Sequence, residues 1–152
     1  MRLVLASIFA ALALLGIGGA AVAAADSTSV EDFTLAYKRT GGIAASTQTL
    51  AVRSGGHATA TSSGTSEGHA RSEFPLTARR IRSLQRSLSR ADLGSIPPAG
   101  PGGCADCYVY DLKYEGRHLK LEEVDVPPRL RAVFDQLDAI IATHLTAPTA
   151  RG

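Results

Sequence analysis

The chain has 152 residues, of which 45% are hydrophobic, so it is long enough for one domain with one modest core. Its formal net charge of +2 excludes the strongly basic and strongly acidic classes, and we expect no nucleic-acid partner. With 4 Tyr, 4 Phe and no Trp, the core must be built mainly from Leu, Val and Ile.

The first 25 residues are predicted to be a signal peptide. Arg2 supplies a positive charge, residues 3–17 are apolar, and small residues at 21–25 suit cleavage before Asp26. The loss of Arg2 would lower the net charge from +2 to about +1. The mature protein would be secreted or lie in the periplasm or cell envelope, with no stable membrane insertion. The alternative is an uncleaved membrane anchor, because the apolar run is long enough to span a bilayer.

A hairpin is expected to open the mature domain, after a flexible lead over residues 26–32. Apolar and polar residues alternate over residues 33–38 and again over residues 47–52, with the period of half-buried strands. Gly41 and Gly42 separate the two runs, and glycines adopt the positive φ angles of tight turns at little cost. The two runs should therefore pair antiparallel.

The middle of the chain is weakly specified. Residues 54–56 form a further turn signal, and residues 57–63 are rich in Thr and Ala, so a third strand is allowed. Residues 62–72 contain mostly Ser, Thr, Gly and charged side chains. We expect them to form a long polar loop.

A first helix is predicted after Leu76, with Thr77 accepting a hydrogen bond from a free backbone N–H. Its buried face is indicated by apolar residues at helical spacing, which are Ile81, Leu84 and Leu88. Gly94 is expected to end it. The opposite face carries four arginines, Arg79, Arg82, Arg86 and Arg90. This basic face is most simply a solvated helix surface, and binding to an acidic surface is the alternative.

A second hairpin and a second helix complete the domain. Residues 107–115 alternate with tyrosines on one face, residues 115–117 form a turn, and Leu119 and Leu121 mark a return strand. After the Pro127–Pro128 pair, apolar residues recur at helical spacing to about residue 144.

The expected fold is α+β, in which an antiparallel sheet of four or five strands carries two helices on one face. The predicted element order is β-β-(β)-α-β-β-α. The domain would span residues 33–145, followed by a flexible tail over 146–152, and we expect a monomer.

The two cysteines, Cys104 and Cys107, would meet an oxidising compartment after export, so a disulfide is expected. A redox enzyme usually places its first thiol at a helix N-terminus, whereas this pair lies between a glycine-rich loop and a strand. We therefore favour a structural disulfide over redox catalysis.

Catalytic and cofactor machinery is not apparent in the sequence. The histidines His57, His69, His118 and His144 are widely spaced, and a metal site from Cys104, Cys107 and His118 is only conceivable. No nucleophile elbow, phosphate-binding loop or dinucleotide fingerprint is present. We expect no enzyme activity, no cofactor and no bound metal.

Several short motifs occur in the order found in one known family. They are the run Arg39-Thr40-Gly41-Gly42-Ile43-Ala44, the helix start at Leu76-Thr77, the tyrosine-rich segment from Tyr108 to Tyr114, and the Val-Pro-Pro-x-Leu step at residues 126–130. With these motifs, the chain resembles the emfourin family of small protein inhibitors of thermolysin-like metallopeptidases, over residues 33–141. The polar middle segment and the cysteine pair depart from the family pattern.

The resemblance implies an inhibitor that occupies the active-site cleft of a metallopeptidase without covalent chemistry. The predicted signal peptide is a further departure from the family pattern, and it would send this protein outside the cell, where secreted metallopeptidases act. The resemblance does not fix which residues touch the target, and our hypothesis is that they are Arg39, Thr40, Gly41, Gly42, Ile43 and Ala44. Ile43 would fill the apolar pocket that such peptidases use for large aliphatic side chains. The alternatives are a binding module of the cell envelope that uses the basic face, and a redox or metal protein that uses the cysteine pair.

Overall fold

The computed structural model describes residues 30–64, 68–97 and 103–146. The predicted signal peptide, the first part of the expected lead, and residues 147–152 of the expected tail lie outside the described residues. Within the described ranges, no helix is long and apolar enough to cross a membrane.

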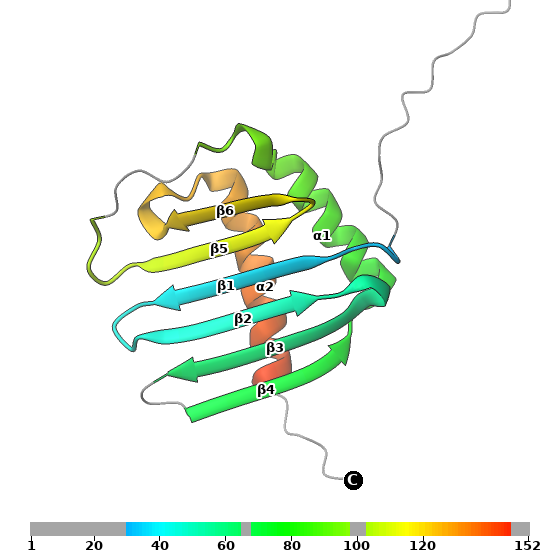
Figure 1. Cartoon of the computed structure of the whole chain (residues 1–152), viewed down its shortest axis with the longest axis horizontal. Helices are drawn as coiled ribbons and strands as arrows, with labels where there is room; N and C mark the ends of the chain where they lie inside the picture. Colours follow the sequence, from blue (N-terminus) through cyan, green and yellow to red (C-terminus); the bar gives the residue numbers. More distant parts are fainter. Residues whose placement is uncertain (1–29, 65–67, 98–102, 147–152) are drawn as a thin grey trace, which may run out of the picture.

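The first layer of the fold is a sheet of six antiparallel strands in the order β4-β3-β2-β1-β5-β6 (Figure 1). The strands are β1 (Leu35–Gly41), β2 (Ser46–Val52), β3 (His57–Gly64), β4 (Gly68–Pro75), β5 (Tyr108–Tyr114) and β6 (Arg117–Glu122). The order follows from two meanders that meet where β1 pairs with β5. Strand β1 is therefore central, and the two halves of the chain meet along its whole length.

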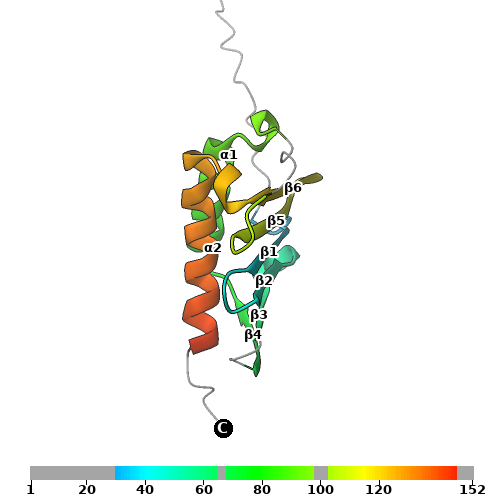
Figure 2. The same cartoon turned by 90° about the vertical axis from the view of Figure 1, so that its left-hand side faces the viewer.

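The second layer consists of α1 (Ala78–Ala91) and α2 (Pro128–Thr146), both on the same face of the sheet (Figure 2). Three short 3₁₀ segments, η1 (Ser54–Gly56), η2 (Leu93–Ser95) and η3 (Glu123–Asp125), lie in the connections. The predicted α+β class with two helices on one face is confirmed.

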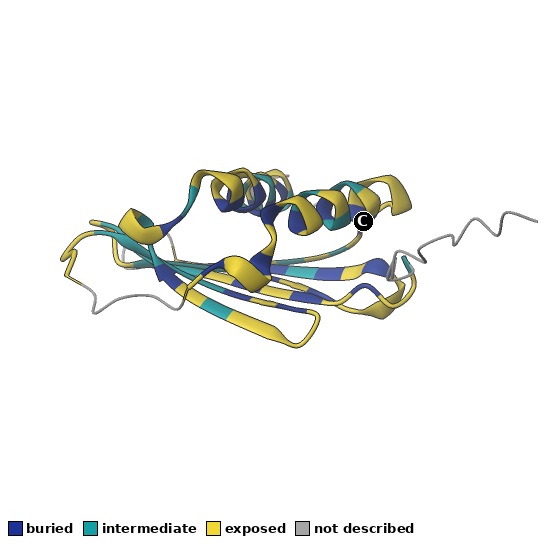
Figure 3. Ribbon diagram, turned by 90° about the horizontal axis from the view of Figure 1, so that it is seen from above, coloured by how far each residue is buried: buried dark blue, intermediate teal, exposed yellow. Residues whose placement is uncertain are grey.

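Burial follows the predicted periodicities. Buried residues lie between the two layers, and the other face of the sheet is mostly exposed (Figure 3). The strand residues that face the helices include Leu35, Tyr37, Leu50 and Leu112. On the helices, the buried set is Ile81, Leu84, Leu88, Ala91, Leu130, Val133, Phe134, Leu137, Ile140 and Ile141. The tyrosines of β5 share one face as expected, and that face points inward, where Tyr110 stacks on Phe134 with ring centroids 4.5 Å apart.

The expected loop over residues 62–72 is wrong, because most of it belongs to the β3–β4 hairpin. Strand β4 pairs with β3 over its whole length, from Gly68 opposite Gly64 to Pro75 opposite His57. Its inward residues are Ala70, Ser72 and Phe74, so only one of them is large and apolar. An edge strand with so few apolar residues carries little hydrophobic periodicity, and the sequence pattern missed it.

The predicted start of α1 is confirmed, and its predicted end is wrong. Thr77 Oγ1 accepts a hydrogen bond from the N–H of Arg80 at 3.2 Å. The helix ends at Ala91, because Asp92 adopts the left-handed conformation with φ of 45° and its N–H donates to the carbonyl of Ser89. Asp92 therefore takes the role expected of Gly94, which lies in η2.

Candidate functional site

The turn between β1 and β2 is a short, fixed hairpin tip over residues 41–45. Gly41 and Gly42 have φ of 120° and 73°, and Ala45 closes the turn by donating its N–H to the carbonyl of Gly42 at 2.9 Å. Ile43 lies at the tip with 95% of its surface exposed. A large aliphatic side chain that is this exposed contributes no hydrophobic stabilisation to the fold of its own protein.

The two glycines allow the hairpin tip to lie directly on the start of β5. A Cβ on Gly41 would overlap the carbonyl oxygen of Cys107, and a Cβ on Gly42 would lie 2.9 Å from the ring of Tyr108. No real Cβ tolerates such distances without movement of its neighbours. The glycine pair is therefore needed for close packing as well as for positive φ.

The segment that supports the hairpin tip is the cysteine loop, residues 103–107. Cys104 and Cys107 are paired, with Cα atoms 5.4 Å apart, a separation that a disulfide requires. The backbone N–H groups of Gly103 and Cys104 donate to Glu122 Oε2 at 3.2 and 3.4 Å. The end of β6 thereby holds the cysteine loop in place.

Arg39 lies on the helix side of β1, beneath the hairpin tip. Its guanidinium donates to Asp138 Oδ2 at 2.5 Å and to Gln48 Oε1 at 2.6 Å, and it lies 4.7 Å from the ring centroid of Tyr108. Only 21% of its side-chain surface is exposed. Arg39 therefore supports the hairpin tip from inside, and a role for its charge in direct contact with a target does not fit this position.

The carboxylate of Asp138 joins α2 to the central strand. Tyr37 donates its hydroxyl to Asp138 Oδ1 at 2.8 Å, beside the ion pair with Arg39. Burial is the largest cause that raises the pKa of Asp138, against the opposing effects of Tyr37 and Arg39. Burial and the nearby Asp138 charge raise the pKa of Tyr37 far above its ordinary range. The hydroxyl of Tyr37 therefore stays protonated and keeps donating to Asp138.

The remaining predicted contact residues differ in exposure. Thr40 is half-buried on the open face of the sheet, and its hydroxyl has no hydrogen-bond partner among the described residues. Ala44 is exposed beside Ile43. The surface available to a partner is therefore the hairpin tip itself, rather than the strand residues that lead into it.

A second exposed apolar side chain lies at the same end of the sheet. Val124 in η3 is 69% exposed, and the described residues contain no other exposed large hydrophobic besides Ile43. The neighbouring Glu123 accepts a hydrogen bond from the N–H of Tyr108 at 3.3 Å, so η3 is joined to the start of β5. Figure 1 shows the hairpin tip, the start of β5 and η3 along one end of the sheet.

We call this region the apolar end and define it by Ile43 and Val124, with the cysteine loop between them. The sequence predicted only Ile43 as a site residue. Val124 was not predicted as a site residue, since it lies among Glu122, Glu123 and Asp125 and fits no periodic pattern. A lone valine within an acidic turn is the one signal that points to it.

The basic face of α1 lies elsewhere. Arg79, Arg82, Arg86 and Arg90 are all exposed, opposite the buried residues of α1. In Figure 2 the end that carries the hairpin tip faces the viewer, and α1 lies behind α2. The structure thus brings the basic face and the hairpin tip to different parts of the molecule.

The conceivable metal site is not assembled. Cys107 precedes the first residue of β5, whereas His118 pairs with Lys113 near the other end of that strand, roughly 15 Å or more away. His118 instead contacts Asp111 at 2.9 Å, and His144 stacks on Phe74 with centroids 3.4 Å apart. Among the described residues, no group of three or more His, Cys, Asp or Glu side chains could hold a metal ion.

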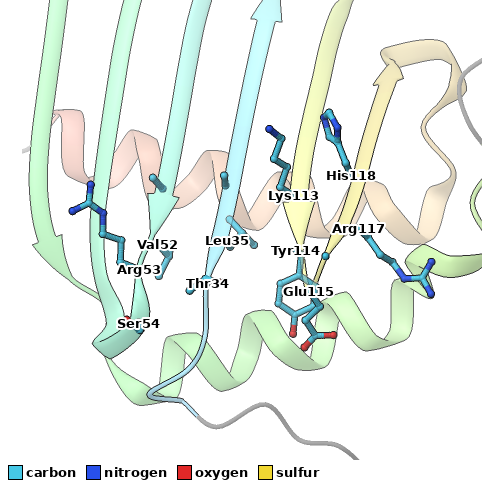
Figure 4. A pocket seen from close by; sticks show the side chains of 13 residues that line it. Thr34, Leu35, Val52, Arg53, Ser54, Lys113, Tyr114, Glu115, Arg117 and His118 are labelled. Carbon is cyan, nitrogen blue, oxygen red and sulfur yellow. The ribbon is translucent and has the colours of Figure 1, made fainter.

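A shallow hollow of about 600 Å³ lies on the open face of the sheet, near the beginning of β1. Figure 4 shows Arg53, Lys113 and His118 around it. Small residues such as Ala36 and Ala51 form part of its lining, and Glu115 lies at its rim. The hollow is at the opposite end of β1 from the hairpin tip and contains none of the predicted target-binding residues.

No protein-family profile matches the chain, and a comparison with curated proteins finds no significant match.

Proposed function

We propose that this protein is an exported inhibitor of a thermolysin-like metallopeptidase, which it blocks by placing the hairpin tip in the active-site cleft. The proposal rests on the resemblance to emfourins and on one observation. Ile43 is 95% exposed on a turn whose two glycines hold it against the start of β5. An exposed apolar side chain on a rigid turn is suited to fill a pocket in a partner.

The mechanism is occupation of the cleft by a turn that is already ordered. A flexible peptide loses side-chain and backbone entropy when it binds, and that loss weakens its affinity. Here the β1–β2 pairing, the contact with the cysteine loop and the Arg39–Asp138 ion pair hold the hairpin tip before binding. Inhibition would therefore need no covalent step and no cofactor.

The direct test is titration of the purified protein into a thermolysin-like peptidase while cleavage of a peptide substrate is followed. We expect stoichiometric loss of activity. The Ile43→Asp variant should inhibit at least about thirtyfold more weakly, because a charge would replace the apolar side chain at the centre of the contact. The matched control is Ser54→Asp, which adds the same charge to exposed η1 at the other end of the sheet.

Two results would contradict the proposal. Inhibition that is equally strong in Ile43→Asp and Ser54→Asp would exclude the hairpin tip as the contact. A correctly folded protein that leaves several such peptidases fully active would exclude the inhibitor function itself.

A second candidate function is binding of acidic cell-envelope polymers by the basic face. Its support is that, within the described ranges, none of the four arginines of the basic face takes part in an ion pair. Such binding would weaken steeply with added salt, and Arg82→Glu together with Arg86→Glu would abolish it. Peptidase inhibition should be insensitive to the same two changes.

A further inference from the structure

Strand β4 is the open edge of the sheet. It is the last strand in the described order, it has 8 residues, and none of them is buried. The opposite edge is partly covered, because the guanidinium of Arg117 on β6 packs against Gly94 of η2. An edge strand this long presents unpaired N–H and C=O groups to any strand that can lie beside it.

The backbone direction of each β4 residue can be derived. The N–H of Leu76 donates to the carbonyl of Gly56 at 2.8 Å, so position 76 faces β3. Directions alternate along an antiparallel strand, and Ala70, Ser72 and Phe74 therefore also face β3. The backbone N–H and C=O groups of His69, Arg71 and Glu73 therefore point outward, away from β3. The carbonyl of Pro75 also points outward, and proline has no backbone N–H.

These directions restrict how β4 can pair with a second copy of itself. Outward residues must oppose outward residues, and the registers that also pair most of β4 have Arg71 with Arg71, Ser72 with Ser72, or Glu73 with Glu73 at their centre. The first and third registers place like charges directly opposite each other on the open face. The register centred on Ser72 alone places Arg71 of each copy opposite Glu73 of the other.

The side chains in that register are complementary on both faces. On the open face, Arg71 already holds Glu73 of its own chain at 2.5 Å and keeps the pKa of that carboxyl below its ordinary value. Both side chains are 66% exposed, so each has room for a second, cross-strand partner. On the helix face, the small Ala70 would oppose the ring of Phe74, which is only partly buried.

We propose that two copies of this chain associate through β4, antiparallel and with the two-fold axis at Ser72, to form one continuous sheet. This dimer would differ from the monomer that the sequence led us to expect. The axis is perpendicular to the sheet, so both helical layers lie on one side and the two hairpin tips point in opposite directions. Both tips remain free, and the inference therefore stands whether or not the protein inhibits a peptidase.

The first test measures molar mass against concentration by sedimentation, for protein expressed from its full sequence. We expect a reversible dimer. Arg71→Glu and Glu73→Arg should each raise the dissociation constant of the dimer about tenfold or more. Each substitution turns both cross-strand pairs of positions 71 and 73 into pairs of like charge. The double variant Arg71→Glu/Glu73→Arg restores opposite charges and should dimerise like the original protein. Unchanged circular dichroism would show that the single variants fold.

The second test reads the register directly. Ser72 would form a pair that is not joined by hydrogen bonds, with Cα atoms about 4.5 Å apart, close enough for a disulfide. Ser72→Cys should therefore cross-link two chains in air, whereas Ala70→Cys, which opposes Phe74, should not. A protein that stays monomeric up to about 1 mM would overturn the proposal. Cross-linking through Arg71→Cys or Glu73→Cys in preference to Ser72→Cys would overturn it as well.

Discussion

Gly41 shows how one residue can fix both the shape and the position of the hairpin tip. Its φ of 120° is unfavourable for any other residue, and its missing Cβ leaves room for the carbonyl oxygen of Cys107. Gly41→Ala should therefore lower the free energy of unfolding by about 2 to 4 kcal/mol. Urea denaturation followed by circular dichroism measures this change.

Gly116→Ala is the matched control for Gly41→Ala. Gly116 also has positive φ, at 72°, but a Cβ there would meet nothing within 4 Å. Backbone strain alone should cost about 1 kcal/mol. Equal losses in the two variants would show that the contact with Cys107 does not constrain the tip.

Asp138 gives the fold a pH dependence whose sign can be worked out. Burial raises the pKa of its carboxyl in the folded protein above the ordinary value of 3.8. Between pH 3.8 and the higher pKa of the folded state, the folded protein binds more protons than the unfolded chain. The free energy of unfolding therefore falls as the pH rises through this range. Asp138→Asn cannot titrate and should lack this fall.

The measurement is the free energy of unfolding of both proteins from about pH 3 to pH 8. The free energy of unfolding of the original protein, minus that of Asp138→Asn, should decrease as the pH rises above 3.8 and then become constant. A difference that instead grows with pH would show that the ion pair with Arg39 lowers the pKa of Asp138 more than burial raises it.

At the scale of elements, the cysteine loop is a support for the hairpin tip. A disulfide between Cys104 and Cys107 closes a very short loop. The cross-link lowers the conformational entropy of the unfolded chain, and for a loop of this length this stabilises the folded state by about 2 kcal/mol. The double variant Cys104→Ser/Cys107→Ser should lose about that amount and still inhibit. Mass spectrometry of the purified protein under alkylating conditions checks the disulfide itself.

A redox function makes the opposite prediction for the same variant. If the protein were a redox enzyme, removal of both thiols would abolish activity while leaving the fold intact. Retained peptidase inhibition by the double serine variant therefore separates a structural disulfide from a catalytic one.

The elements that the sequence predicted correctly are those with strong apolar periodicity. The inward face of β5 and the buried face of α2 consist of large apolar residues at regular spacing, and both were placed correctly. Strand β4 has mostly small or charged residues, and its position is decided by pairing with β3. Backbone hydrogen bonding between strands leaves no periodic signal in one sequence.

The candidate site was predictable only in part for a similar reason. The glycine pair marks a turn in any context, so the hairpin tip and the position of Ile43 followed from local residues. Strand alternation puts Arg39 on the same face as Tyr37, but its partner there is Asp138, which lies 99 residues further along the chain. The place of Val124 at the same end of the sheet as the tip depends on how β5 pairs with β1 and β6, which local patterns do not contain.

At the scale of the whole molecule, charge and apolar surface are separated. The arginines of α1 lie behind α2, away from the apolar end, which carries Glu122, Glu123 and Asp125 around Val124 (Figure 2). A partner that docks at the apolar end would therefore meet acidic groups at its rim. Electrostatic attraction to a basic surface would then speed association and make its rate depend on salt.

Val124 tests whether a partner uses the whole apolar end or the hairpin tip alone. It is 69% exposed and lies across the cysteine loop from Ile43, so a surface that covers both must be broader than a single pocket. If the peptidase rim reaches η3, Val124→Asp should weaken inhibition about tenfold, less than Ile43→Asp, because rim contacts contribute less than a central one. If the two side chains act on the partner independently, the effects should add in the double variant. Inhibition by Val124→Asp equal to that of the Ser54→Asp control would confine the contact to the tip.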